Sequence, residues 1–159
     1  MLQEHLHLTT IQYGWITLAL TVTILLTKLI NTFLLEYIHV DKIVFYSLIV
    51  LLAACGLLLT FALQHLYTVE TIVIPFILFG AGSGFLFSNG TVAAFRDFKR
   101  VASGSVSGLI NCIQFLFAFV GSTIAAHIDI THLLPLALLL IMMTLLTFIF
   151  YICLDCMEK

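Results

Sequence analysis

Charged residues are scarce in this sequence. Lysine and arginine together number 6 and aspartate and glutamate 8 among 159 residues, so charged side chains make up 9% of the chain and hydrophobic ones 62%. Ordinary soluble domains carry roughly 25% charged residues, whereas the mean hydropathy here is +1.21. This composition excludes a soluble domain, and the lack of a basic run predicts no nucleic-acid partner.

Cysteine is also sparse, and its placement predicts no disulfide framework. Cys55 and Cys112 lie inside apolar runs, and Cys153 and Cys156 lie near the end of the chain. The spacing of the last two matches redox motifs, but the strand and helix of a thioredoxin-like unit do not precede them. Residues 1–10 contain no lysine or arginine, so we expect no secretory signal peptide.

Long apolar runs dominate what remains. They cover residues 11–35, 43–63, 71–95, 101–126 and 133–154, and each is long enough to cross a bilayer, which takes about 20 residues. Backbone groups inside lipid must be satisfied within their own segment, so these runs are predicted to be helices. The sequence therefore predicts an all-α integral membrane protein with about five transmembrane helices in a single membrane domain, residues 1–159.

The basic residues all fall on one side of these five predicted spans. They are Lys28, Lys42, Arg96, Lys99, Arg100 and Lys159. The loops on the other side carry acidic residues and histidines but no lysine or arginine. Because cytoplasmic loops collect basic residues, we expect the amino terminus outside and the carboxyl terminus in the cytoplasm. Many transporters are built from even-numbered repeats of spans, so we expect a five-span chain that begins outside to be part of a larger protein whose first part is missing.

Glycine is concentrated in the third span, at Gly80, Gly82 and Gly84. A dinucleotide-binding loop would need a preceding strand and a later acidic residue, which are absent. Gly80 and Gly84 are one helical turn apart, and small residues at that spacing let a neighbouring backbone approach closely in a membrane. We therefore predict that they pack against another helix.

The fourth span carries small residues and two amides. Gly104 and Gly108 repeat the one-turn spacing and are predicted to pack in the same way. Ser107, Asn111 and Gln114 share one helical face, since they are four and three residues apart. Amides within a membrane need a polar partner, so this face either lines an aqueous substrate cavity or hydrogen-bonds to a neighbouring helix.

The first span holds a second polar group. Asn31 lies near its end, and Lys28 lies one turn earlier. A charge within a span pairs, lines water or extends to the interface, so both residues are candidates for a substrate cavity.

Five of the six histidines lie in or next to the segments on the side of the membrane that carries no lysine or arginine. The sequence does not bring these histidines together, so we predict no metal site. We find no catalytic constellation and expect neither an enzyme nor a cofactor.

Two segments carry a resemblance to a known family. The first runs from Gly80 to Gly90, with the sequence GAGSGFLFSNG, and the second runs from Gly104 to Gln114, with the sequence GSVSGLINCIQ. They resemble the glycine-rich segments in the second half of major facilitator superfamily transporters, particularly the bacterial drug-resistance group of bicyclomycin and chloramphenicol exporters. Ser88 stands where that family usually has proline, and Asn111 stands where it has glycine.

The resemblance implies the last five of twelve spans, in a partial bundle of the major facilitator type. Its implied function is multidrug or small-molecule efflux across a bacterial inner membrane, by proton-coupled antiport when complete. Small hydrophobic or cationic compounds would be the substrates, and a chain carrying the missing spans would be the partner beside the lipid bilayer. We expect the chain to be inactive alone. The alternative is a small membrane scaffold or assembly partner that does not transport.

Overall fold

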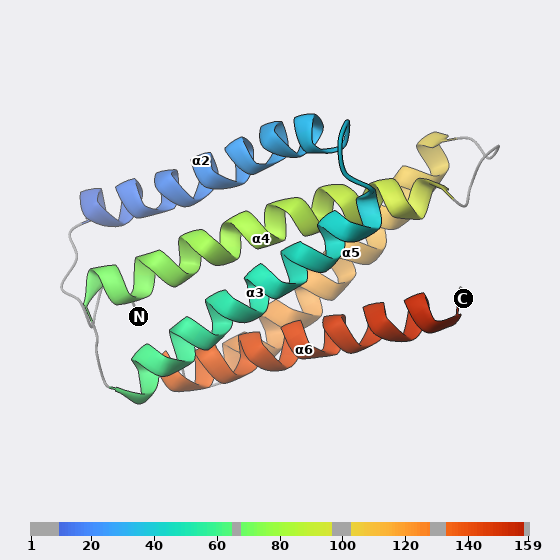
Figure 1. Ribbon diagram of the computed structural model, residues 1–159. Helices are drawn as coiled ribbons and strands as arrows, with labels where there is room; N and C mark the ends of the chain where they lie inside the picture. The colour runs from blue at the N-terminus through green and yellow to red at the C-terminus, as the bar shows by residue number, and fades with distance from the viewer. Residues whose placement is uncertain (1–9, 65–67, 97–102, 128–132, 158–159) are drawn as a thin grey trace.

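The computed structural model describes residues 10–64, 68–96, 103–127 and 133–157. These residues form the helices α2 (Thr10–Leu34), α3 (Val40–Leu63), α4 (Val69–Arg96), α5 (Ser103–His127) and α6 (Leu133–Met157) (Figure 1). No strand occurs within the described ranges. The prediction of an all-α chain with five long helices is confirmed, and each helix begins and ends within three residues of its predicted span.

The length and composition of these helices suit a bilayer. α3 has 24 residues and α4 has 28, or about 36 and 42 Å at 1.5 Å per residue, and the hydrocarbon core is about 30 Å thick. All five helices are long and apolar enough to cross a membrane. Large apolar side chains are exposed on every helix, as at Leu25, Ile49, Phe87, Phe117 and Ile149. The chain is a multi-pass membrane protein whose outer surface contacts lipid.

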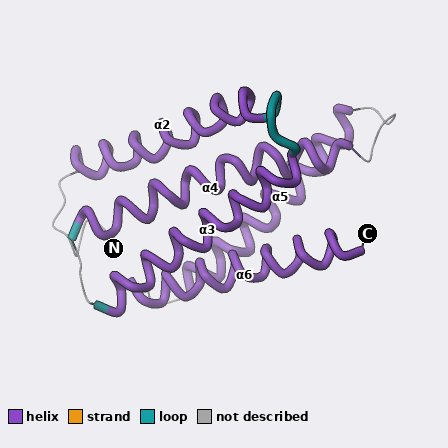
Figure 2. The backbone as a smooth tube through the Cα atoms, in the orientation of Figure 1, coloured by secondary structure: helices purple, strands orange, loops and turns teal. Residues whose placement is uncertain are grey.

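Successive helices run in opposite directions (Figure 1). The main contacts join α2 to α4, α4 to α3 and α3 to α6, while α5 makes only a slight contact with α4. The tube view shows the same order, with α2 at one edge and α6 at the other (Figure 2). The helix α4 therefore lies between α2 and α3, although it follows both in the sequence.

The apolar core is made by three helices. One cluster joins residues of α3, α4 and α6, namely Leu58, Ala62, Ile72, Leu133 and Ala137. A second cluster has Val44, Leu48 and Leu51 of α3 at its centre. Partly buried residues of α4 and α6, such as Phe79 and Phe148, pack against that second cluster. α2 and α5 supply no residue to either cluster, so α3, α4 and α6 form the body of the bundle.

Glycines let α4 approach its neighbours on two sides. A Cβ added at Gly84 would lie 3.2 Å from the Cβ of Thr27 on α2, and one added at Gly80 would lie 3.7 Å from Ile24. On the other side, a Cβ at Gly82 would lie 2.9 Å from the Cγ of Leu51 on α3. The absence of these side chains lets α4 fit between two helices.

Candidate functional site

Asn31 of α2 and Asn89 of α4 form a buried pair of side-chain amides. The Nδ2 group of Asn89 donates a hydrogen bond of 2.7 Å to Oδ1 of Asn31, and Nδ2 of Asn31 donates one of 3.3 Å to Oδ1 of Asn89. The exposed fraction of Asn31 is 3% and that of Asn89 is 0%. Asn89 Nδ2 also donates to the Phe85 carbonyl at 2.8 Å. Each amide thus meets the hydrogen-bonding need of the other between two membrane helices.

The amide pair continues a contact that begins one turn earlier. Ile24, Thr27 and Asn31 are three and four residues apart, so they share one face of α2. That face meets Gly80, Gly84 and Asn89 of α4 in the same order along the helices. The Thr27 hydroxyl donates to the Thr23 carbonyl of its own helix at 2.7 Å. Thr27 therefore buries its hydroxyl without needing a partner on α4.

The structure places the two polar candidates of the first span differently. Asn31 lies in the contact between α2 and α4, where Asn89 occupies its amide. Lys28, one residue after Thr27, is exposed on the flank of the same helix. A lysine stem can run along an apolar surface and carry its ammonium group to the membrane interface. The two side chains do not meet in a common cavity.

The polar candidates of α5 lie near the surface. Asn111 is exposed, whereas Ser107 and Gln114 are partly exposed. The Ser107 hydroxyl donates to the Gly104 carbonyl at 3.2 Å. Within the described residues, neither the Asn111 nor the Gln114 side chain has a hydrogen-bond partner. These amides are therefore available to a group outside the described chain.

Two glycines of α5, Gly104 and Gly108, lack the close helix contacts that Gly80, Gly82 and Gly84 of α4 make. A Cβ added at Gly104 or at Gly108 would meet nothing within 4 Å. Both glycines are exposed, and so are Asn111, Ala118 and Ser122 on the same face of the helix. The exposed face, which we call the outer face of α5, consists of Gly104, Gly108, Asn111, Phe115, Ala118 and Ser122. Val106, which lies off this face, is the one buried side chain among those described on α5.

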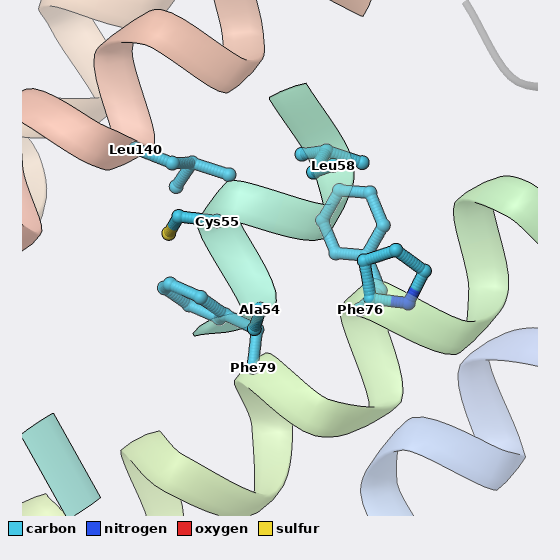
Figure 3. A pocket seen from close by; sticks show the side chains of 7 residues that line it. Ala54, Cys55, Leu58, Phe76, Phe79 and Leu140 are labelled. Carbon is cyan, nitrogen blue, oxygen red and sulfur yellow. The ribbon is translucent and has the colours of Figure 1, made fainter. Parts of the chain in front are cut away.

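A small apolar pocket lies between α3, α4 and α6 (Figure 3). It is lined by Ala54, Cys55, Leu58, Pro75, Phe76, Phe79 and Leu140. The Cys55 sulfur lies 3.5 Å from the Thr144 hydroxyl oxygen, whose hydrogen bond goes to the Leu140 carbonyl at 2.8 Å. The space does not admit a water molecule. It is a gap in helix packing and is too small to hold a substrate.

No group of three or more potential metal ligands occurs in the described part of the chain. His127 ends α5, and its Nδ1 lies 2.9 Å from the Thr123 carbonyl oxygen. His5, His7, Asp129 and His132 lie outside the described residues. His127 therefore has a contact within its own helix.

Two contact residues were not singled out from the sequence. In the sequence, Asn89 is part of the glycine-rich segment from Gly80 to Gly90, and Gly82 is one of three glycines in the third span. A mid-span asparagine does indicate a polar partner, but two other asparagines, Asn31 and Asn111, were available, and only the fold selects Asn31. Gly82 lies on the opposite side of α4 from Gly80 and Gly84, and that alternation indicates a helix with close neighbours on two sides.

Comparison with protein-family models, curated proteins and solved structures finds no match to this chain. The resemblance to major facilitator transporters therefore depends on the two glycine-rich segments themselves.

Proposed function

We propose that this chain is the carboxyl-terminal portion of a small-molecule efflux transporter, and that it is inactive without further spans. Two observations support the proposal: the family resemblance of α4 and α5, and the outer face of α5. The complete transporter would exchange protons for hydrophobic or cationic compounds. We place it in a bacterial inner membrane, with the amino terminus outside, because the basic residues segregate to one side.

The outer face of α5 is the observation that carries this proposal. Lipid-facing helix surfaces are covered by bulky apolar side chains, whereas this surface presents two glycines and an amide. Asn111 is eight residues after the start of α5, which is about 12 Å along the helix and thus well inside the bilayer. An unpaired amide at that depth is unfavourable, and exposed small residues favour helix contact. Further spans that cover this face would give the Asn111 amide a polar partner and would pack against the two glycines.

The depth of these α5 residues in the membrane also suggests where substrate would bind in the complete transporter. Transporters built from two repeats bind substrate near the bilayer midplane, between the halves. Asn111 and Gln114 lie near the middle of α5, and the exposed ring of Phe115 adjoins them. In the assembled transporter we assign these three side chains to the cavity wall, because binding sites combine apolar surface with a few polar groups. We do not assign Asn31 to that wall, because its amide is hydrogen-bonded to Asn89.

The test is ethidium efflux from cells that express the chain alone or with a companion chain carrying the missing spans. We expect no efflux from the chain alone. With the companion, we expect efflux that Gln114→Ala weakens and Ile113→Ala does not, because Ile113 lies on the side of α5 opposite to Asn111 and the outer face. Robust proton-driven efflux by the chain alone, lost in Gln114→Ala, would show that five spans suffice and would overturn the proposal.

A second candidate is a membrane scaffold or assembly partner that does not transport. It is favoured by the position of the acidic residues, since Glu36, Asp41, Glu70 and Asp155, the four in the described ranges, all lie beyond a helix end or within three residues of one. A proton-coupled transporter carries a titratable group within its spans, so in the leading proposal the companion spans must supply it. Pull-down of a stable partner, with no efflux in any combination, would favour the scaffold.

A further inference from the structure

The helix α2 is attached to the bundle in an unusual way. Its buried side chains among the described residues are Thr27 and Asn31, both polar. It supplies nothing to the apolar clusters of α3, α4 and α6, and α4 is the one helix with which it makes an extended contact. Figure 1 shows α2 along this edge of the bundle. The contact with α4 therefore determines where α2 lies.

The contact of Thr27 with a glycine does not by itself determine one position of α2 along the helix axis. Thr27 now lies against Gly84, and the next glycine on that face is Gly80, one turn away. A shift of α2 by one turn, about 5.4 Å, would bring Thr27 against Gly80 and Asn31 against Gly84. In both positions Thr27 faces a glycine, which has no side chain, at the point of closest approach. The glycine spacing thus permits two registers of α2 on α4.

The amide pair distinguishes these two registers. In the observed register Asn31 and Asn89 satisfy each other through two hydrogen bonds. In the shifted register Leu35 would take the place of Asn31, and Asn89 would face an apolar side chain. The Asn31 amide would also lose its partner within the membrane. Apolar contacts with lipid and with protein are similar in energy, so the amides supply the main difference between the two positions.

We propose that the Asn31–Asn89 pair is a register lock, which holds α2 in one of two positions one helical turn apart on α4. One-turn shifts of a helix past its neighbour are a known form of conformational switching, and a single buried asparagine can specify helix register. Leu35 continues the last turn of α2, because its N–H donates a hydrogen bond to the Asn31 carbonyl. The link to α3 is therefore residues 36–39, which now form a compact turn, and four residues can extend to about 14 Å, enough to permit the shift. The lock does not depend on the proposed transport function.

Disulfide cross-linking in membranes tests the lock with one pair of cysteines for each register. All native cysteines are first replaced by alanine. The pair Thr27→Cys and Gly84→Cys reports the observed register. The two Cβ positions are 3.2 Å apart, and an outward movement of α2 by a few tenths of an ångström brings them to the roughly 3.5–4.5 Å that a disulfide needs. The pair Thr27→Cys and Gly80→Cys reports the shifted register. With both asparagines present, we expect the first pair to cross-link and the second to remain largely reduced.

Asn31→Leu and the double variant Asn31→Leu with Asn89→Leu should release the lock. We expect the ratio of shifted to observed cross-links to rise about three- to fifteen-fold, the range that corresponds to measured interhelical hydrogen bonds in membranes. Thr32→Leu is the matched control, because Thr32 is an exposed neighbour whose hydroxyl bonds within α2. It should leave the ratio unchanged.

Two results would overturn the lock. One is an unchanged ratio in the leucine variants, and the other is equal cross-linking of both pairs when the asparagines are present. Where a leucine variant does not accumulate in the membrane, Asn31→Ser and Asn89→Ser replace it. Serine is small and bonds within its own helix, so it removes the amide pair without a bulky side chain. The same ratio decides the outcome.

Discussion

Thr27 and Gly84 are in such close contact that a Cβ at position 84 would lie 3.2 Å from both Cβ and Cγ2 of Thr27. On the other side of α4, a Cβ at Gly82 would lie 3.2 Å from the Ser47 carbonyl oxygen and 2.9 Å from the Leu51 side chain. The helix α4 is therefore confined on two sides. Gly84 and Gly82 are points at which α2 and α3, respectively, lie close to it.

Gly84→Leu should destabilise the chain, because a leucine side chain would push α2 away from α4. Overpacking of a close contact costs about 1–3 kcal/mol. Gly90→Leu is the control on the same helix, since a Cβ there meets nothing within 4 Å. Thermal unfolding in detergent, followed by circular dichroism, measures the difference. Equal midpoints for the two variants would contradict the packing role of Gly84.

Gly82→Ala should be more harmful than Gly80→Ala. The methyl group at 82 meets a backbone carbonyl as well as Leu51, whereas the methyl group at 80 lies 3.7 Å from Cγ1 of the Ile24 side chain, an ordinary van der Waals distance. Backbone cannot move aside as a side chain can. The midpoints of thermal unfolding should therefore fall for Gly82→Ala and change little for Gly80→Ala, and the reverse order would refute this account.

Gly108→Leu should leave the stability of the isolated chain unchanged. Sequence reasoning placed Gly108 in the same class as Gly84, but nothing in the described residues approaches it within 4 Å. If the outer face of α5 binds companion spans, the substitution should instead reduce co-purification of the two chains. A lowered unfolding midpoint without loss of co-purification would point to a contact of Gly108 within its own chain.

Leu48→Ala should destabilise the body of the bundle. Leu48 is fully buried in the second apolar cluster, and truncation of a buried leucine costs about 2–5 kcal/mol, including the cavity it leaves. Leu146→Ala is the control because Leu146 is 52% exposed. Chemical denaturation in mixed micelles compares them. Similar losses in both variants would argue against a core centred on α3.

The loop after α4 should be cytoplasmic and the loop after α5 external. Positions 98 and 130 lie in these loops, outside the described residues, and cysteines introduced there report their location. An impermeant thiol reagent applied to intact cells should label Ile130→Cys and not Phe98→Cys, because basic residues are retained inside. The opposite pattern would reverse the proposed orientation. The native cysteines are replaced by alanine for this measurement.

The number and extent of the helices could be predicted from the sequence because each helix is a separate apolar run that satisfies its own backbone. The contact of Gly80 and Gly84 with another helix was also predictable in kind from their spacing. Its partner was not predictable, since the sequence contains several polar or small helix faces of similar appearance. Thr27 and Asn31 lie more than fifty residues from Gly84 and Asn89, and local periodicity does not encode such a pairing.

The sequence by itself determined five membrane-spanning helices, because hydropathy and backbone hydrogen bonding act along the chain. Only the tertiary structure decided which face of each helix meets protein. Both lipid and the interior of a membrane protein are apolar, so the hydrophobic pattern that separates inside from outside in a soluble protein is weak here. The difference between Gly84, which is covered by Thr27, and Gly108, which is uncovered, consequently arises from helix packing.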